Sequence, residues 1–360
     1  MESRVGVNYK RNGWYFAFCG VLPVVMEEII MWKMVQCAVQ GRSHIKTDIP
    51  CQDKTFTLVK NGVNVIALAD GAGSAKFSHY GAERITRFIC DDFSENFDSY
   101  FTAEDGALVK KVLVSKIVAE LDDLSKELNC SLKELASTLL FVAVKENQFI
   151  LSHIGDGVIG YLKDNDLKIA SQPENGEFTN TTVFTTSKDV LATMKLIKGN
   201  IGDIQGFVLM SDGTEVSLYN KREKKLADVL KKIMSLCLVI LPQKMEEQLL
   251  SSFESVIKQA TTDDCSIVLM ANDKDSFPGY KNLSNVEKNK LLDFHVSVSK
   301  KRLRRYDEIL KGLECERTLK DISRIIHLKP RFTKKHLDKL LHLNLIEKKG
   351  TRYHTIIIMN

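Results

Sequence analysis

The chain has 360 residues, of which 44% are hydrophobic and 27% are charged, with only six prolines. This composition is ordinary for a globular protein and excludes long low-complexity stretches, and the length allows a sizeable domain beside a smaller one. The net charge of +5 is uneven, because from residue 274 onward 21 Lys and Arg stand against 10 Asp and Glu, whereas the remainder carries 30 against 36. This asymmetry favours two domains with different partners.

Residues 1–30 form an N-terminal extension whose nature the sequence leaves open. Its apolar run, 14–26, imitates an export signal, but it is too short for a membrane span and meets Glu27 and Glu28 without a small-x-small cleavage site. Three alternatives remain: a packed or peripheral extension, a non-native upstream translation start with Met31 as the true start, and an export signal.

Residues 31–271 alternate short β-branched or apolar runs with longer helical periods. Turn residues at hairpin spacing separate many of the runs, so the sheets should be largely antiparallel, with helices packed outside them. The predicted strands are 35–39, 56–59, 63–69, 139–144, 149–154, 157–162, 207–210 and 266–270. The predicted helices are 80–93, 108–128, 226–238 and 245–258.

The strand pattern stops after residue 271. Residues 272–299 are predicted to be a polar linker, and residues 300–360 a basic domain that resembles a winged helix. In that domain three helical periods precede a strand, a turn and a strand, and Pro330 separates the second helix from the third. The helical periods are 303–310, 319–326 and 333–343, and the final hairpin is 345–353.

Aspartates stand at four points where an apolar run gives way to a turn: Asp70, Asp156, Asp212 and Asp263. Mg²⁺ and Mn²⁺ prefer carboxylate and carbonyl oxygens, so these residues suit a site for such ions. Two ions about 4 Å apart can activate a water molecule and clamp a phosphoryl oxygen. A single Asp-Gly is usually only a hairpin turn, but several unpaired carboxylates brought together repel one another unless a cation is bound.

Six segments resemble the motifs of the protein phosphatase 2C family, in that family's order, over residues 34–271. The segment GRSH at 41–44 is most similar to a bacterial subgroup. The resemblance implies an α+β fold, an αββα sandwich of two antiparallel sheets flanked by helices, and a protein-serine/threonine phosphatase with two or three Mn²⁺ or Mg²⁺ ions. The motifs are PCQD at 50–53, ADGAGS at 69–74, STL at 137–139, IGDG at 154–157, SDG at 211–213 and TDDCS at 262–266.

The resemblance also implies roles for individual residues. Asp70 would bridge two metal ions, and the carbonyl of Gly71 would bind one of them. Asp212 and Asp263 would complete the pair, so that these two residues and Asp70 form the catalytic set. Asp156 would help to hold a looser third ion.

Around this set, Asp53 would orient metal-bound water without binding a metal ion itself. The chain departs from the family at two positions. Asp48 stands where many members carry an Arg that holds the substrate phosphate, and Ala72 replaces the His proposed as general acid in animal relatives. The candidates to replace that Arg as phosphate ligand are Arg42, His44 and Lys46.

The basic C-terminal domain has two roles that stay open: contact with DNA, and contact with a protein or intramolecular regulation. Winged helices serve both, and no side-chain pattern here specifies a base contact. The residues expected to bind nucleic acid or a partner are Lys334, Lys335 and Lys339 on the third helix and Arg352 at the tip of the hairpin.

The leading hypothesis is hydrolysis of phosphoserine and phosphothreonine in proteins by a metal-activated water. The partner is then a phosphorylated protein, either a kinase or its target. A phosphosensing transcriptional regulator with a weakly active or inactive phosphatase-like domain is the first alternative, and a metal-binding structural domain is the second. Eight cysteines without a C-x-x-C pair exclude a zinc knuckle and favour reduced thiols in the cytoplasm, away from membranes.

Overall fold

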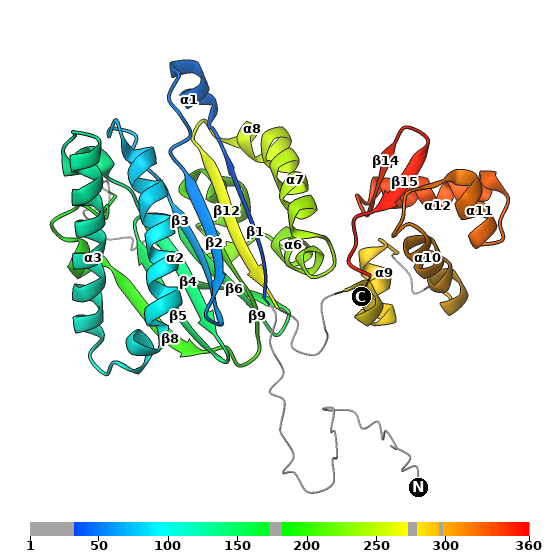
Figure 1. The fold of residues 1–360 in the computed structure, drawn as a ribbon, viewed down its shortest axis with the longest axis horizontal. Coiled ribbons are helices and arrows are strands. Elements are labelled where there is room, and N and C mark those ends of the chain that lie inside the picture. The colour runs from blue at the N-terminus through cyan, green and yellow to red at the C-terminus, as the bar shows by residue number, and fades with distance from the viewer. Residues whose placement is uncertain (1–31, 173–181, 273–278, 295–297, 360) are drawn as a thin grey trace, which may run out of the picture. The chain divides into compact units, whose positions relative to one another are not determined.

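The structure is a computed structural model, and it describes residues 32–172, 182–272, 279–294 and 298–359. The extension predicted at 1–30 lies outside the described residues. The larger domain contains two five-stranded antiparallel sheets with helices on their outer faces (Figure 1). This arrangement confirms the predicted αββα sandwich.

Each sheet is assembled from strands that are distant in the chain. The first contains, in spatial order, β1 (Lys33–Val39), β12 (Cys265–Ala271), β9 (Ile204–Met210), β6 (Val158–Lys163) and β7 (Asp166–Ser171). The second contains β2 (Lys54–Lys60), β3 (Val63–Ala69), β4 (Leu139–Lys145), β5 (Gln148–Ile154) and β8 (Lys195–Asn200). β1 pairs with β12 from Lys33 opposite Ala271 to Val39 opposite Cys265, so the first strand of the domain lies beside its last.

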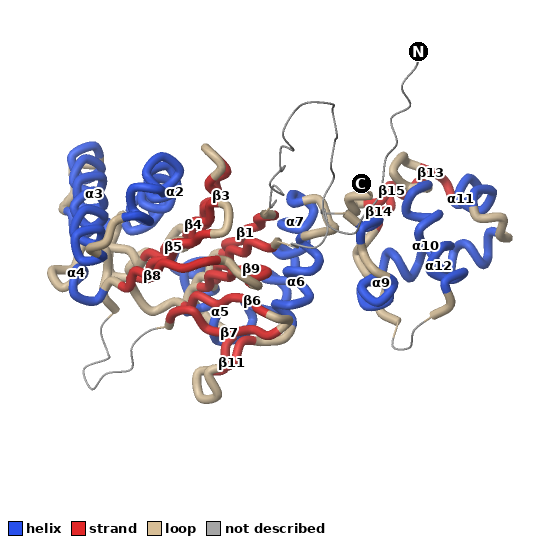
Figure 2. The backbone as a smooth tube through the Cα atoms, turned by 90° about the horizontal axis from the view of Figure 1, so that it is seen from below, coloured by secondary structure: helices blue, strands red, loops and turns tan. Residues whose placement is uncertain are grey.

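Helices cover the outer face of each sheet, with α2 and α3 on one side of the sandwich and α6 and α7 on the other (Figure 2). α2 packs on β2, β3 and β4, and its buried Phe93 lies 4.5 Å from Phe141 of β4 between ring centroids. Between the sheets, Phe149 of β5 lies 5.4 Å from Phe207 of β9. The central strands are therefore buried on both faces, which explains their nearly continuous apolar sequences. The larger helices are α2 (Ser78–Thr102), α3 (Gly106–Glu127), α6 (Val229–Cys237) and α7 (Pro242–Ser252).

Shorter elements complete the larger domain. A π-helical turn at Phe253–Ile257 continues α7 into α8, and a 3-10 turn at Leu132–Leu135 precedes β4. The remaining elements are α1 (Arg42–Thr47), α4 (Val190–Thr193), α5 (Asp212–Leu218), α8 (Lys258–Ala260), β10 (Tyr219–Asn220) and β11 (Lys225–Leu226).

Residues 300–359, predicted to be a separate C-terminal domain, have the element order predicted for them, and the division into domains stays a prediction. The helices are α10 (Lys300–Gly312), α11 (Leu319–Ile325) and α12 (Pro330–His342), and the sheet contains β13 (Arg317–Thr318), β15 (Arg352–Thr355) and β14 (Ile346–Lys349). The two-residue strand β13 was not predicted. The likeness to a winged helix stays a prediction.

The linker predicted at 272–299 is wrong for residues 280–291. A 3-10 turn at Tyr280–Asn282 leads into α9 (Asn285–Leu291), which Ser284 and Glu287 begin with a capping box. Tyr280 is fully buried, and its backbone N–H donates to the carbonyl of Ile358 at 2.7 Å. One buried aromatic side chain and a helix cap hold this segment in place. Its composition is otherwise polar, so the sequence pattern indicated a linker and not a helix.

All seven cysteines in the described residues are free. Within the same residues, no helix combines the length and the apolar character needed to cross a bilayer. A cytoplasmic location stays a prediction.

Candidate metal centre

The four aspartates at strand ends line one cavity of about 290 Å³. Asp70 follows β3, Asp156 lies in the turn between β5 and β6, Asp212 begins α5 directly after β9, and Asp263 lies in the turn before β12. These elements come from both sheets, so the stacking of the sheets brings the four residues to one edge of the sandwich. Gly71 and Ala72 also line the cavity.

The carboxylates lie close enough to change one another's ionisation. Burial raises the pKa of Asp70 well above its usual value, and the nearby carboxylates of Asp53, Asp212 and Asp156 raise it further. Burial, together with Asp156 and Asp263, raises the pKa of Asp212 to about 6. Negative charge is therefore concentrated here without compensation, which is the electrostatic condition that a cation relieves.

Asp53 lies beneath this group and is only 1% exposed. Burial and the neighbouring carboxylate of Asp264 raise the pKa of Asp53 to about 7. Both carboxylate oxygens of Asp53, and Oδ1 of Asp212, are buried without a well-formed hydrogen bond among the described residues, although the nearby hydroxyls of Ser266 and Ser211 partly offset the raised pKa of Asp53. Unsatisfied buried acceptors of this kind are where a cation or its bound water supplies the missing partner.

The side chains that face the cavity suit a hard divalent ion, because four of them are aspartates and such ions prefer carboxylate oxygens. Within the described part of the chain, however, no three Asp, Glu, His or Cys side chains converge tightly enough to hold an ion as they lie. The aspartates face a common cavity but are not drawn together at its centre.

Backbone contacts fix the loops that carry these residues. A Cβ atom on Gly213 would lie 2.0 Å from the carbonyl oxygen of Asp264, so the start of α5 sits directly against the turn before β12. The N–H of Asp70 donates to Oγ1 of Thr138 at 2.8 Å, and the N–H of Thr138 donates to the carbonyl of Asp70 at 2.8 Å. These contacts hold Asp70 and Asp212 at the cavity edge.

Asp264 is a site residue to which the sequence assigned no role. Its buried carboxylate accepts the N–H of Gly41 at 2.5 Å and the N–H of Gln52 at 2.6 Å. Nδ1 of His44 lies 2.9 Å from the same carboxylate. Asp264 therefore ties segments more than 200 residues away to the metal centre. It lies inside the TDDCS motif, but nothing in the motif indicates those partners.

Thr182 is a second residue that the sequence did not identify. Its Oγ1 donates to Oδ2 of Asp156 at 2.5 Å, and Thr182 lines the cavity together with Phe184. Neither residue belongs to a recognisable motif, so only the folded structure brings them to the site.

The three candidate phosphate ligands occupy different places. His44 lines the cavity, whereas Arg42 and Lys46 do not. Nε of Arg42 donates to the carbonyl of Thr261 at 2.9 Å, and Lys46 is exposed on α1. Asp48 ends α1 in the left-handed conformation, with φ of 55°. Among the described residues that line this cavity there is no Lys or Arg.

The candidates in the C-terminal domain are also divided. Lys335 and Lys339 line a separate cavity between α10 and α12, whereas Lys334 and Arg352 are exposed outside it. The four basic residues predicted from sequence therefore do not form one cluster: two line a cavity and two lie outside it.

Comparisons with known proteins find phosphatases similar to this chain. The family model described as "Protein phosphatase 2C" matches residues 40–253. Serine/threonine-protein phosphatase 3 of Escherichia coli (strain K12) is 24% identical over 172 residues, 46% of this chain. The match spans 66% of that relative, just under two thirds of its length.

Solved structures of bacterial phosphatases are also similar to the chain. Serine/threonine phosphatase Stp1 from Staphylococcus aureus has 16% identity and a TM-score of 0.45, covering 70% of this chain and 100% of that one. The S. agalactiae serine/threonine phosphatase has 13% identity and a TM-score of 0.47, covering 68% of this chain and 100% of that one.

Proposed function

Because the chain belongs to the protein phosphatase 2C family, whose members depend on metal ions, we propose that it hydrolyses phosphoserine and phosphothreonine in proteins with Mn²⁺ or Mg²⁺. The observation that carries the proposal is the meeting of Asp70, Asp156, Asp212 and Asp263 at one cavity. Burial and mutual repulsion raise the pKa of Asp70 and Asp212 there, as a cation site requires.

The proposed ligands divide by position. Asp70, the carbonyl of Gly71, Asp212 and Asp263 would hold two ions, and Asp156 would contribute to a third. The bound ions would lower the pKa of a water molecule and stabilise negative charge on the phosphoryl oxygens.

The chain's own residues would position these ligands and the substrate. Asp53, whose buried oxygens lack well-formed hydrogen bonds among the described residues, would hold water in place beneath Asp70. Thr138 and Thr182 would fix Asp70 and Asp156 through the hydrogen bonds described above. His44, which lines the cavity, is the strongest of the three candidates to contact the substrate phosphate.

The deciding experiment measures hydrolysis of p-nitrophenyl phosphate and of a phosphothreonine peptide by purified protein with Mn²⁺. Turnover should disappear with a chelator and fall by roughly 100-fold or more in Asp212→Asn. Asp166→Asn is the matched control, because Asp166 is exposed on β7 and does not line the cavity. A folded Asp212→Asn variant as active as the parent protein would refute the site assignment.

The same assay addresses the alternatives. A phosphosensing regulator or a structural metal domain would bind Mn²⁺ but turn over neither substrate. The family match favours the enzyme over both. The proposed partner is accordingly a phosphorylated protein, either a kinase or a kinase target.

A further inference from the structure

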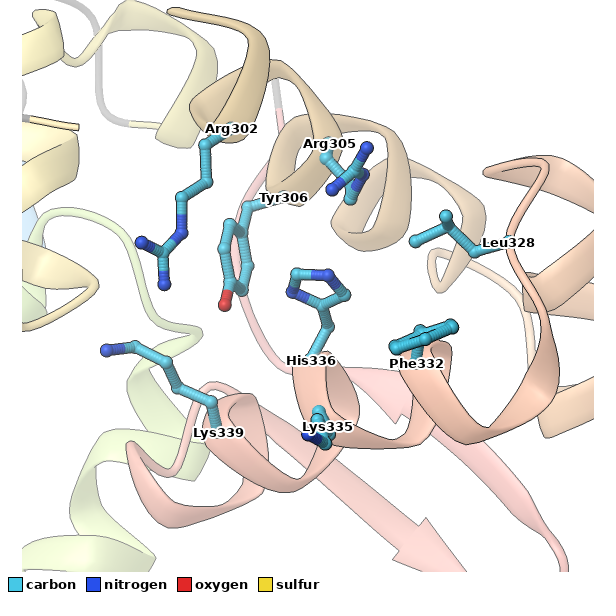
Figure 3. A pocket seen from close by; sticks show the side chains of 8 residues that line it. All are labelled: Arg302, Arg305, Tyr306, Leu328, Phe332, Lys335, His336 and Lys339. Carbon is cyan, nitrogen blue, oxygen red and sulfur yellow. The ribbon is translucent and has the colours of Figure 1, made fainter. Parts of the chain in front are cut away.

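A second cavity, of about 460 Å³, lies within the C-terminal domain between α10 and α12 (Figure 3). This volume is typical of pockets that bind small ligands. None of the described residues that line it is acidic, and four are cationic: Arg302, Arg305, Lys335 and Lys339.

The positive charge in this cavity is not balanced by neighbouring carboxylates. Elsewhere on α10, Nε of Arg304 pairs with Glu308 at 3.1 Å, and Asp307 pairs with Lys288 at 3.3 Å. Within the described ranges, none of the four lining cations forms an ion pair. Basic side chains converging on a concave surface without counter-charges attract an anion, and phosphate matches their hydrogen-bonding geometry.

Two of the cations are held in place by an aromatic ring. The Nζ of Lys339 lies 4.1 Å from the ring centroid of Phe294 and donates to the carbonyl of Asp293 at 3.2 Å. The guanidinium of Arg302 lies 4.6 Å from the same centroid. Arg305 and Lys335 lack such contacts, so they are the better positions at which to change charge without disturbing packing.

The rest of the cavity wall is apolar or aromatic. Phe332 is 39% exposed although it is a large hydrophobic residue, and Leu328 lies beside it in the cavity wall (Figure 3). The His336 ring meets the buried Tyr306 edge-on at 5.1 Å, and burial with the neighbouring arginines lowers the pKa of His336. The guanidinium of Arg331 lies 4.5 Å from the centroid of the Phe332 ring, so only the ring surface that Arg331 leaves open can stack with an aromatic ring system.

We propose that this cavity binds a nucleotide unit, with its phosphate at the cationic side chains and its base on the wall formed by Phe332 and Leu328. The unit can come from a free mononucleotide or from single-stranded nucleic acid, because both present an unstacked base beside a phosphate. A phosphopeptide would engage the cations but not the aromatic wall. A duplex keeps its bases stacked and out of reach of the cavity.

The test is calorimetry on the full-length Asp212→Asn protein in a chelator, so that the metal centre contributes neither binding nor hydrolysis. The probes are AMP, adenosine, inorganic phosphate, an eight-nucleotide single strand, a twelve-base-pair duplex and a phosphothreonine peptide. AMP or the single strand should bind at least about 10-fold tighter than phosphate, adenosine, duplex or peptide, because only they use both walls. Tighter binding of the strand than of AMP identifies the strand as the source, and the reverse identifies the free nucleotide.

Paired variants locate the binding. Arg305→Gln combined with Lys335→Gln should weaken AMP binding at least about 10-fold, since two charge-assisted contacts are lost. The control, Arg304→Gln with Lys334→Gln, removes the same charge from the same helices outside the cavity and should leave binding unchanged. Phe332→Ala should abolish the preference for AMP over inorganic phosphate.

Several outcomes would overturn the proposal. They are the absence of AMP and strand binding, equal affinity for the duplex or the phosphopeptide, and equal losses in the cavity and control pairs. Circular dichroism melting checks that each variant is folded. If Arg305→Gln unfolds the domain, the exposed Lys335→Glu alone must still weaken binding. These results do not depend on phosphatase activity, so the proposal can fail while the proposed function holds.

Discussion

Single residues at the metal centre act through partners that are remote in the sequence. Asp264 accepts backbone N–H groups from Gly41 and Gln52, both more than 200 residues away. A carboxylate that satisfies two buried donors serves the structure as well as the chemistry. Its loss is therefore expected to affect both.

Replacing Asp264 by Ala should lower the free energy of unfolding by roughly 2–4 kcal/mol, because two buried donors lose their acceptor. Phosphatase activity should fall too, since Gly41 caps α1, the helix that carries His44. Urea denaturation and peptide hydrolysis measure the two effects. Asp166→Ala, on an exposed strand position, should change neither, and an equal loss in both variants would argue against the anchoring role.

Only some of the residues that line the candidate metal centre could be predicted from the sequence. Asp70, Asp156, Asp212 and Asp263 could be singled out because each ends a buried run. Thr182 could not, because a threonine that donates to a carboxylate 26 residues away leaves no local pattern.

At the scale of elements, a glycine couples α2 to the loop that supports Asp70. A Cβ atom on Gly81 would lie 2.1 Å from the carbonyl oxygen of Leu135, where the 3-10 turn passes against the helix. Ser137 and Thr138 follow that turn directly, and Thr138 holds Asp70. A change in the packing of α2 against the 3-10 turn should therefore shift Thr138 and, through it, Asp70.

Gly81→Ala should destabilise the protein by about 1–3 kcal/mol, because backbone must shift to admit the methyl group. Gly106→Ala is the matched control, since Gly106 is also helical but no atom lies within 4 Å of the position that its methyl group would occupy. That substitution should be neutral or stabilising by about 0.5 kcal/mol. Thermal melts of both variants test the contrast, which would be absent if α2 and the turn were loosely packed.

Strand prediction succeeded where burial was symmetrical. The interval 63–69 matches β3, whose two faces are both covered. β7 and β8, which were not predicted, are edge strands with short apolar runs broken by polar residues, and β8 also contains Gly199. The other two edge strands, β1 and β2, were predicted because their apolar and β-branched runs are longer. An edge strand is fixed by its neighbour's hydrogen bonds rather than by its own apolar pattern.

At the scale of the whole molecule, the carboxylates of the proposed metal centre should make the free energy of unfolding depend on pH and on metal. In the folded protein, burial and nearby carboxylates raise the pKa of Asp212 to about 6 and that of Asp53 to about 7. An unfolded Asp titrates near pH 3.9, so between about pH 4 and 7 the folded state holds more protons than the unfolded state. The free energy of unfolding therefore decreases as the pH rises through this window.

The metal-free protein should accordingly melt at a lower temperature at pH 8 than at pH 5. Mn²⁺ should raise the melting temperature by roughly 5 °C or more at pH 8 and by less at pH 5, where protons compete for the carboxylates. Differential scanning fluorimetry at the two pH values measures this. Asp212→Asn should reduce the Mn²⁺ effect, and an equal Mn²⁺ shift at both pH values would contradict the linkage.

The pairing of β1 with β12 determines at which stage of synthesis the proposed metal centre can assemble. β1 can pair with β12 only after the ribosome has released residue 271. Asp263, in the turn before β12, reaches the cavity only at that late stage. A nascent or prematurely terminated chain thus carries Asp70 and Asp212 without the complete set of carboxylates that lines the cavity. The proposed hydrolysis therefore requires that almost the entire larger domain has been translated.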